Sequence, residues 1–468
     1  MLLKAILLLG GVSWVSGKVQ YMGMSMAGFD SGCKIDGTCS TDSAQSPMSS
    51  DALDQMQHFV NDDQMNVFRL PVSWQFLVNN EIGRKLDSPN FVQYDELMQA
   101  CLGLGTHCVI DIHNFARFNG AIIGQGGPTD SQFADLWVEL ATKYKDNSKV
   151  IFGLMNEPHG LDVPTWAKTV QTVVTAIRTA GATSQMILLP GSDFASAGQF
   201  VRSGSADALI KVTNPDRSTD GLIFDLHGHL DQDNSGALAE CTTDNVADGF
   251  AIAADFLRQN RRQALVSETR AGSAESCVTN LCAQNKFLNE NSDVFLGYIA
   301  WAAGALPASD ISSLTPLKPN GKYVDNELVS QCVVAPWGHA GMATPRSPNA
   351  AVAPPSTPSS PKSTEPTSTN AAVAIVADTY SPSAINSTET PEDALIGTFV
   401  RTYSKVETTA IPTSILAAGG TAPPLMSSQT GTRTSPPSTP PVATGGAATR
   451  KCAGWLFVGS LLVALTIG

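Results

Sequence analysis

The chain contains 468 residues, of which 43% are hydrophobic and only 15% are charged, and its net charge is −13. Soluble proteins average about 25% charged residues, so part of this chain differs from an ordinary folded domain. Residues 341–450 carry six basic and six acidic side chains, whereas residues 19–340 carry 20 basic and 36 acidic ones, a net charge of −16. Because phosphate binding requires a basic face, this acidic region excludes nucleic acid as the partner but leaves a neutral polymer such as a glycan.

The N-terminal segment has the pattern of a secretory signal. Lys4 precedes an apolar run, Ala5–Val15, and the small residues Ser16 and Gly17 follow it. A buried helix is the alternative, but the run is short and begins close to the initiator methionine. We therefore predict a signal peptide over residues 1–17 and secretion of the protein.

Residues 18–340 alternate between candidate strands and helices. Most of the strands are continuous apolar runs, which is typical of parallel strands covered on both faces. Apolar residues at helical spacing lie between several of them, and only the connection after Pro190 contains no clear single helix. Eight strands with helical crossovers favour an α/β fold of the closed (β/α)8 TIM-barrel type over an open sheet. The predicted strands are 19–24, 67–71, 108–113, 150–155, 186–190, 222–227, 264–268 and 295–301.

Eight of the nine cysteines lie in this region, and the ninth, Cys452, lies near the C-terminus. An even number of cysteines can pair completely as disulfides, which is typical of a protein in an oxidising compartment. The short spacings of Cys33 with Cys39 and of Cys101 with Cys108 suggest local disulfides. The sequence has no closely spaced cysteine pair of the metal-binding type.

The C-terminal region has a different composition, because Pro, Ser and Thr make up 51 of the 110 residues from 341 to 450. Such a segment buries too little apolar surface to offset the entropy of its chain. We predict a disordered, O-glycosylated linker or stalk over residues 341–445, with an N-glycosylation acceptor at Asn386.

The last residues resemble a lipid-anchor signal. Trp455–Gly468 is apolar except for Ser460 and Thr466, and it is shorter than the roughly 20 residues that span a bilayer as a helix. Small residues at 445–448 and a short polar spacer precede it, as in a glycosylphosphatidylinositol (GPI) signal. We predict that residues 446–468 are this signal and are removed, with a tail-anchored helix as the alternative. The protein would then be a monomer held at the cell surface or wall by a lipid anchor.

Polar residues repeatedly follow the predicted strands. In a barrel these positions share one rim, where the chemistry of this fold takes place. Two carboxylates about 5 to 5.5 Å apart can cleave a glycosidic bond with retention, one as acid and the other as nucleophile. We choose Glu157 and Glu268, which follow the fourth and seventh strands. The other candidates on the rim are Arg69, Asp111, His113, Asn114, Asn156, His227, His229 and Trp301.

Five motifs in order resemble glycoside hydrolase family 5, and specifically its fungal endo-β-1,4-glucanases. They are Phe68-Arg69-Leu70-Pro71, Asp111-Ile112-His113-Asn114, Met155-Asn156-Glu157-Pro158-His159, Ser267-Glu268-Thr269 and Gly297-Tyr298-Ile299-Ala300-Trp301. The resemblance implies the barrel fold, a retaining mechanism on β-glucan, Glu157 as acid/base, Glu268 as nucleophile, and neither a cofactor nor a metal. It also implies the disulfides Cys33–Cys39, Cys101–Cys108, Cys241–Cys277 and Cys282–Cys332.

These roles lead to expectations for the neighbouring residues. Arg69, a fixed cation, would hold Glu268 ionised, and Asn156 would donate to the sugar 2-hydroxyl. Trp301 would offer an apolar face to a sugar ring. Further candidates for such faces are Trp74, Phe115 and Phe118.

The chain departs from the family pattern near the site. His229 stands where the family has a tyrosine that touches the nucleophile, and a protonated His229 would weaken Glu268 as a nucleophile. Phe115 and Phe118 replace a typical tyrosine and tryptophan, and Arg270 lies in a turn that is usually rich in glycine. We therefore expect reduced or pH-shifted activity on the internal β-1,4 bonds of cellulose or related β-glucans.

Two other functions compete with hydrolysis. His227 and His229 lie on one face of a strand like the metal pair of barrel amidohydrolases, but suitable lysine, histidine and aspartate ligands are missing from the other strand ends. The departure at His229 motivates a second alternative, a catalytically weakened glucan-binding or wall-structural protein. The intact carboxylates and Arg69 favour the enzyme.

Overall fold

The computed structural model describes residues 17–83 and 85–339. The predicted signal peptide, the predicted stalk with Asn386, and the predicted anchor signal lie outside the described residues, apart from Gly17. Within the described ranges, no helix is both long enough and apolar enough to cross a membrane.

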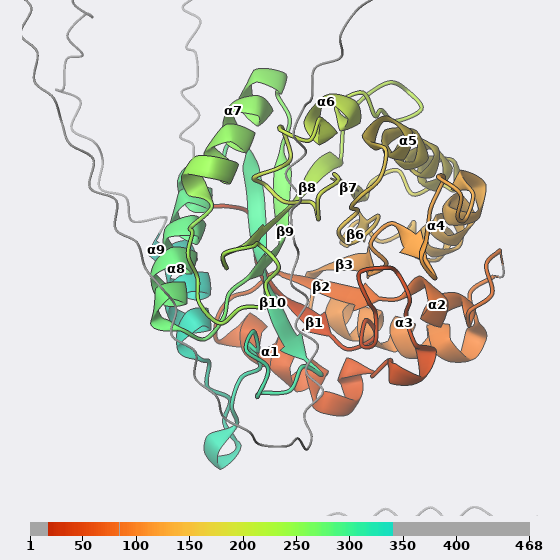
Figure 1. Cartoon of the computed structure of the whole chain (residues 1–468). Coiled ribbons are helices and arrows are strands. Elements are labelled where there is room, and N and C mark those ends of the chain that lie inside the picture. The colour runs from red at the N-terminus through yellow and green to blue at the C-terminus, as the bar shows by residue number, and fades with distance from the viewer. Residues whose placement is uncertain (1–16, 84, 340–468) are drawn as a thin grey trace, which may run out of the picture. The chain divides into compact units, whose positions relative to one another are not determined.

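Eight parallel strands close into a barrel, with helices around it (Figure 1). The order around the barrel is β1-β10-β9-β8-β7-β6-β3-β2. Each predicted strand overlaps one of these eight, so the TIM-barrel prediction is confirmed. Their bounds are β1 Tyr21–Ala27, β2 Val67–Val72, β3 His107–Ile112, β6 Val150–Gly153, β7 Met186–Pro190, β8 Leu222–His229, β9 Ala264–Arg270 and β10 Phe295–Gly304.

The connections between the strands are mostly α-helices. They are α1 Ala52–Asn61, α2 Trp74–Val78, α3 Ser88–Gly103, α4 Asp130–Tyr144, α5 Val163–Thr179, α6 Ser205–Leu209, α7 Ala251–Asn260, α8 Glu275–Glu290 and α9 Ala335–His339. Short 3-10 or π-helical turns are η1 Thr41–Ser43, η2 Pro47–Ser50, η3 Val246–Phe250, η4 Pro319–Gly321 and η5 Val329–Val334. The sequence analysis did not predict the small hairpin of β4 Arg117–Phe118 and β5 Ala121–Ile122. After Pro190 the chain forms only the five-residue α6, consistent with the weak helical pattern there.

Helix α5 illustrates how the sequence determines the outer layer. The Asp162 side chain accepts a hydrogen bond from the Thr165 amide and so satisfies one of the free N–H groups at the helix start, where Pro164 also fits. The apolar stripe that includes Trp166, Val170 and Val174 is fully buried against the barrel. Burying each such side chain contributes about 1.5–3 kcal/mol.

Inside the barrel, an apolar floor gives way to a polar layer. Side chains alternate between the two faces of a strand, so the residue two positions after a floor residue points inward again. On β2, β3 and β8 this next position holds Arg69, Asp111 and Asp225, all buried. The strands thus present charged groups directly above the floor, toward their C-terminal ends. The floor takes one residue from each strand: Tyr21, Val67, Val109, Ile151, Leu188, Ile223, Leu265 and Ile299.

The structure contains the four disulfides that the resemblance implies. Two of them are local, Cys33–Cys39 and Cys101–Cys108. The other two attach helix α8 to distant segments through Cys241–Cys277 and Cys282–Cys332. Their sequence separations of 36 and 50 residues restrict the unfolded chain more than the local pairs do.

Candidate active site

Arg69 is the fixed cation at the centre of the rim. Its Nη1 donates to Glu268 Oε2 at 2.7 Å, and its Nη2 donates to Asn156 Oδ1 at 2.6 Å. The same Nη2 lies 3.0 Å from Asp111 Oδ2. Arg69 is only 2% exposed, so these charges interact with little screening by water. The structure thus brings Arg69, Asn156 and Glu268 together as the sequence analysis expected.

Glu268 reaches the interior because β9 is irregular. Leu265 belongs to the floor, so strict alternation would point residue 268 outward. The pairing of β8 with β9 skips one residue, because Leu226 pairs with Val266 but His227 pairs with Glu268. A β-bulge of this kind re-aims the side chain that follows it.

The surroundings of Glu268 favour its ionised form. Burial alone would favour the neutral acid, but the Arg69 charge and the hydrogen bond from His229 outweigh it and hold the pKa of Glu268 well below its usual range. A carboxylate that is ionised at every working pH can act as a nucleophile.

Glu157 lies beyond the end of β6, in a backbone conformation with φ of +45° that side-chain-bearing residues rarely adopt. Its Oε1 lies 3.1 Å from His227 Nδ1. The other ring nitrogen of His227 lies 3.1 Å from Ser267 Oγ, so the imidazole is held from both sides. These contacts fix the Glu157 carboxyl above the polar layer.

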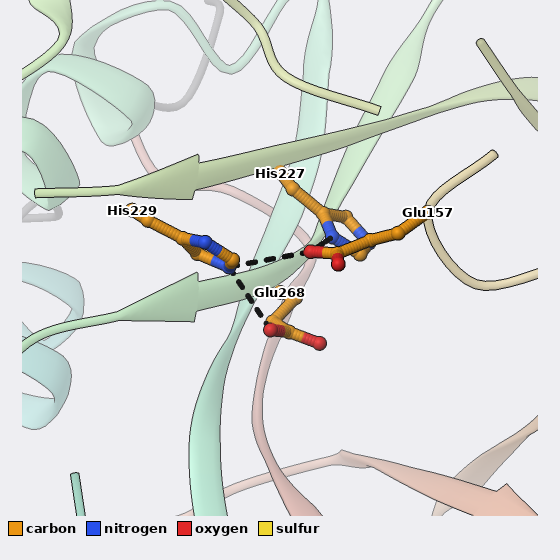
Figure 2. A group of neighbouring side chains, drawn as sticks. All are labelled: Glu157, His227, His229 and Glu268. Carbon is orange, nitrogen blue, oxygen red and sulfur yellow. Dashed lines mark hydrogen bonds and ion pairs between the residues drawn. The ribbon is translucent and has the colours of Figure 1, made fainter. Parts of the chain in front are cut away.

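One ring nitrogen of His229 contacts both glutamates, as Figure 2 shows. Its Nε2 is 3.0 Å from Glu268 Oε1 and 3.6 Å from Glu157 Oε1, while its Nδ1 donates to the Asn234 carbonyl at 3.0 Å. Burial disfavours the imidazolium, but the hydrogen bond with Glu268 and the charges of both glutamates raise the pKa of His229 to about 9. His229 is therefore cationic at neutral pH.

The loop that follows β8 orients His229. Asp231 accepts hydrogen bonds from the amides of Gly236 and Leu238, which closes the loop around the Asn234 carbonyl. Gly236 has φ of +71°, and a Cβ there would lie 2.4 Å from Arg270 Cδ, so only glycine fits beneath that arginine. Arg270 and His229 both differ from the family pattern, and Arg270 packs against the loop that orients His229.

The two carboxyl groups are close enough for a retaining mechanism. The ligand atoms of Glu157, His227, His229 and Glu268 all lie within 4.8 Å of one another. Retaining glycosidases have carboxyl groups about 5–5.5 Å apart, whereas inverting enzymes keep about 6.5–9.5 Å. The four residues could also hold a metal ion by distance, although Arg69 and the cationic His229 already pair with Glu268. The prediction that no cofactor is used stays a prediction.

His113 and Asn156 extend the site toward Trp301. His113 Nδ1 lies 2.8 Å from Asp111 Oδ2, and its Nε2 lies 3.4 Å from Asn156 Nδ2. The His113 ring stacks on Trp301 with centroids 5.3 Å apart. Because Asn156 Oδ1 already accepts from Arg69, its amide nitrogen is directed to the other side. That nitrogen lies toward His113, and its role as a donor to a sugar hydroxyl stays a prediction.

The aromatic candidates divide into two groups. Trp74 is 1% exposed and packs against Phe118 and Phe133 in the core, so the expectation that it faces a sugar is wrong. Phe115 lies beside His113, with ring centroids 5.4 Å apart. The sequence analysis missed Phe194, which is only partly buried and stacks on His159 at 4.4 Å. The available signal was its position four residues after the predicted strand 186–190, because the loops that follow barrel strands form the site.

Comparisons with known proteins agree with this geometry. A family model described as cellulase (glycosyl hydrolase family 5) matches residues 26–304. The chain is 53% identical to "Endoglucanase EG-II" of Hypocrea jecorina over 326 residues, which cover 68% of this chain and 78% of that protein. It is 47% identical to "Endoglucanase 1" of Saitozyma flava, covering 65% of this chain and 86% of the relative. The crystal structure of Cel5A (EG2) from Hypocrea jecorina superposes with a TM-score of 0.67 at 53% identity, covering 68% of this chain and 99% of that one.

Proposed function

Because this chain belongs to glycosyl hydrolase family 5, we propose that it acts as a retaining endo-β-1,4-glucanase, with Glu157 as acid/base and Glu268 as nucleophile. The observation that carries these roles is the pair of buried carboxyl groups within 4.8 Å of each other, of which Arg69 holds one ionised. The relatives named endoglucanases support β-glucan as the substrate.

The reaction proceeds in two displacements. Glu268 attacks the anomeric carbon while Glu157 gives its proton to the departing glycosidic oxygen, which leaves a glycosyl ester on Glu268. Glu157, now ionised, takes a proton from water, and the resulting hydroxide equivalent attacks the anomeric carbon and releases Glu268. The amide nitrogen of Asn156 donates to the 2-hydroxyl, and this contact strengthens as positive charge develops on the ring.

The substrate class can be tested with the purified secreted protein. New reducing ends are measured after incubation with β-1,4, mixed-linkage and β-1,3 glucans, xyloglucan and mannan. We expect the largest rate with a glucan that contains β-1,4 bonds. Binding to these glucans without cleavage of any of them would support the glucan-binding alternative instead.

His229→Tyr is expected to raise kcat about fivefold to tenfold near neutral pH. The imidazolium carries a positive charge that a phenol lacks, and we take its attraction to stabilise the Glu268 carboxylate before attack by about 1 kcal/mol more. The pKa of His229 is raised to about 9, so the difference between variant and wild type should be largest below that pH and shrink above it. The measurement is kcat against pH for both proteins.

His107→Gln is the control for this experiment, because His107 lies on β3 beside Tyr21, far along the strand from the rim. Its profile should match the wild type. Coinciding profiles of wild type and His229→Tyr would show that the charge of His229 does not affect the nucleophile.

We also propose that the enzyme is secreted and held at the cell surface or wall by a GPI anchor, at the end of a stalk over residues 341–445. The small residues at 445–448 and the apolar tail support this proposal. A phospholipase C specific for phosphatidylinositol should release the protein from washed cells, and a chain that stops at residue 440 should appear directly in the medium. A released protein that retains the apolar tail would contradict the anchor.

A further inference from the structure

A second cluster of ionisable groups lies outside the active site. His58 is in the last turn of α1, Asp62 and Asp63 follow that helix, and Asp325 belongs to the segment after β10. His58 Nδ1 lies 2.7 Å from Asp62 Oδ2, and His58 Nε2 lies 3.0 Å from Asp325 Oδ1 and 3.9 Å from Asp63 Oδ2. One imidazole therefore faces three carboxylates, which leaves an excess of negative charge even when the ring is protonated.

The Asp63 side chain has an unused acceptor within this cluster. Asp63 is 9% exposed, and its buried Oδ2 accepts no hydrogen bond. An unpaired buried carboxylate oxygen is costly, and such groups normally have a partner or bind a cation. Lys318, which lines the pocket beside the cluster, pairs with Asp54 at 3.3 Å.

The arrangement matches the ligands that zinc prefers. We propose that His58, Asp63 and Asp325 bind a divalent transition-metal ion such as Zn²⁺, with water as a fourth ligand. Ligand atoms around tetrahedral zinc lie about 3.3 Å apart, and the two distances from His58 Nε2 bracket this value at 3.0 and 3.9 Å. The three ligand atoms all lie within 4.8 Å of one another.

Asp62 supplies the support that zinc-bound histidines usually have. It accepts from His58 Nδ1–H, which fixes the tautomer and turns the Nε2 lone pair toward Asp63 and Asp325. The imidazole ligand argues for zinc over Ca²⁺ or Mg²⁺, which prefer oxygen. His58 also lines an open pocket of about 380 Å³ beside the cluster, together with Asp62, Lys318 and Lys322.

A bound ion would join segments that are far apart in the sequence. His58 and Asp325 are separated by 267 positions, so the metal would attach the segment after β10 to the end of α1. Binding to the folded state alone stabilises it in proportion to the logarithm of the ligand concentration. For the chelator-treated, full-length secreted protein we expect excess Zn²⁺ to raise Tm by about 5 °C.

The experiment must separate this site from the active site, whose four ligands could also take the ion. The rise in Tm should persist in His229→Tyr and in the control His107→Gln, and it should disappear in His58→Gln and in Asp325→Asn. Competition with a chromophoric zinc chelator counts the bound zinc ions. His229→Tyr should keep the ion that is bound by His58. This readout does not depend on glucanase activity.

Three results would overturn the proposal. In the first, Zn²⁺ does not change Tm in the wild type, as expected if Asp63 and Asp325 share a proton instead. In the second, the rise in Tm is lost only in His229→Tyr. In the third, Ca²⁺ produces the shift and Zn²⁺ does not. Should His58→Gln fail to fold, Asp63→Asn and Asp325→Asn, each nearly identical in shape to the wild type, still decide the question.

Discussion

Glu268→Gln is expected to lower kcat on β-1,4-glucan by roughly 10⁴-fold or more, since the amide cannot form the glycosyl ester. The glutamine keeps the volume of the side chain and an oxygen that accepts from Arg69 Nη1. Asp111 and Asn156 continue to hold the guanidinium, so the fold should remain intact. The measurement is single-turnover and steady-state cleavage, together with Tm to show that the variant is folded.

The product formed with an added nucleophile identifies the role of Glu268 more specifically than a loss of rate does. With Glu268→Gly and an aryl β-cellobioside, added azide can occupy the space left by the carboxylate and displace the aryl oxide, which forms the α-glycosyl azide. The matched control is Glu275→Gln, an exposed glutamate in the first turn of α8, which should have wild-type kcat. If Glu268→Gln retained more than about a tenth of the wild-type kcat, Glu268 would not be the nucleophile.

Glu157→Gln is expected to lower kcat on polymeric glucan by about 10²- to 10⁴-fold, because the departing sugar oxygen is a poor leaving group without a proton. The loss should be small for the first step on an aryl glycoside whose leaving group needs no proton. A burst of aryl oxide should then appear, since the variant also lacks the base for the second step. The measurement is pre-steady-state release of the aryl oxide.

The contrast between the two variants distinguishes the two glutamates. Azide added to Glu157→Gly should give the β-glycosyl azide, because azide attacks the glycosyl ester on the face that water normally uses. Equal losses on polymer and on activated glycoside would contradict the assignment of Glu157 as the acid. His227, whose Nδ1 lies 3.1 Å from Glu157 Oε1, would then be the next group to examine.

The barrel and both glutamates could be predicted because their signals are local in the sequence. The run Met186–Pro190 was predicted as a strand with the bounds that β7 has, and polar residues followed apolar strands at the rim. Glu157 and Glu268 were chosen because they follow the fourth and seventh strands, and the resemblance then implied which is the acid/base and which the nucleophile. These features depend on residue type and spacing alone.

The remaining features depend on contacts between distant segments. The bulge that turns Glu268 inward is a property of the register between β8 and β9, and strict alternation would have placed that side chain outside. The Asn234 carbonyl that orients His229 belongs to a loop whose path the spacing did not indicate. Trp74 was misjudged because its burial results from packing against Phe133 on α4, almost sixty positions away.

The disulfide between Cys282 and Cys332 would have a mechanical consequence under the proposed anchoring through the C-terminal side. A pull on the chain beyond residue 339 reaches Cys332 before it reaches β10. The covalent bond passes that load to α8, and Cys241–Cys277 passes it on to the segment before α7. The load path therefore bypasses β10 with Trp301 and β9 with Glu268, and it returns to the chain at Cys241, next to the loop that orients His229.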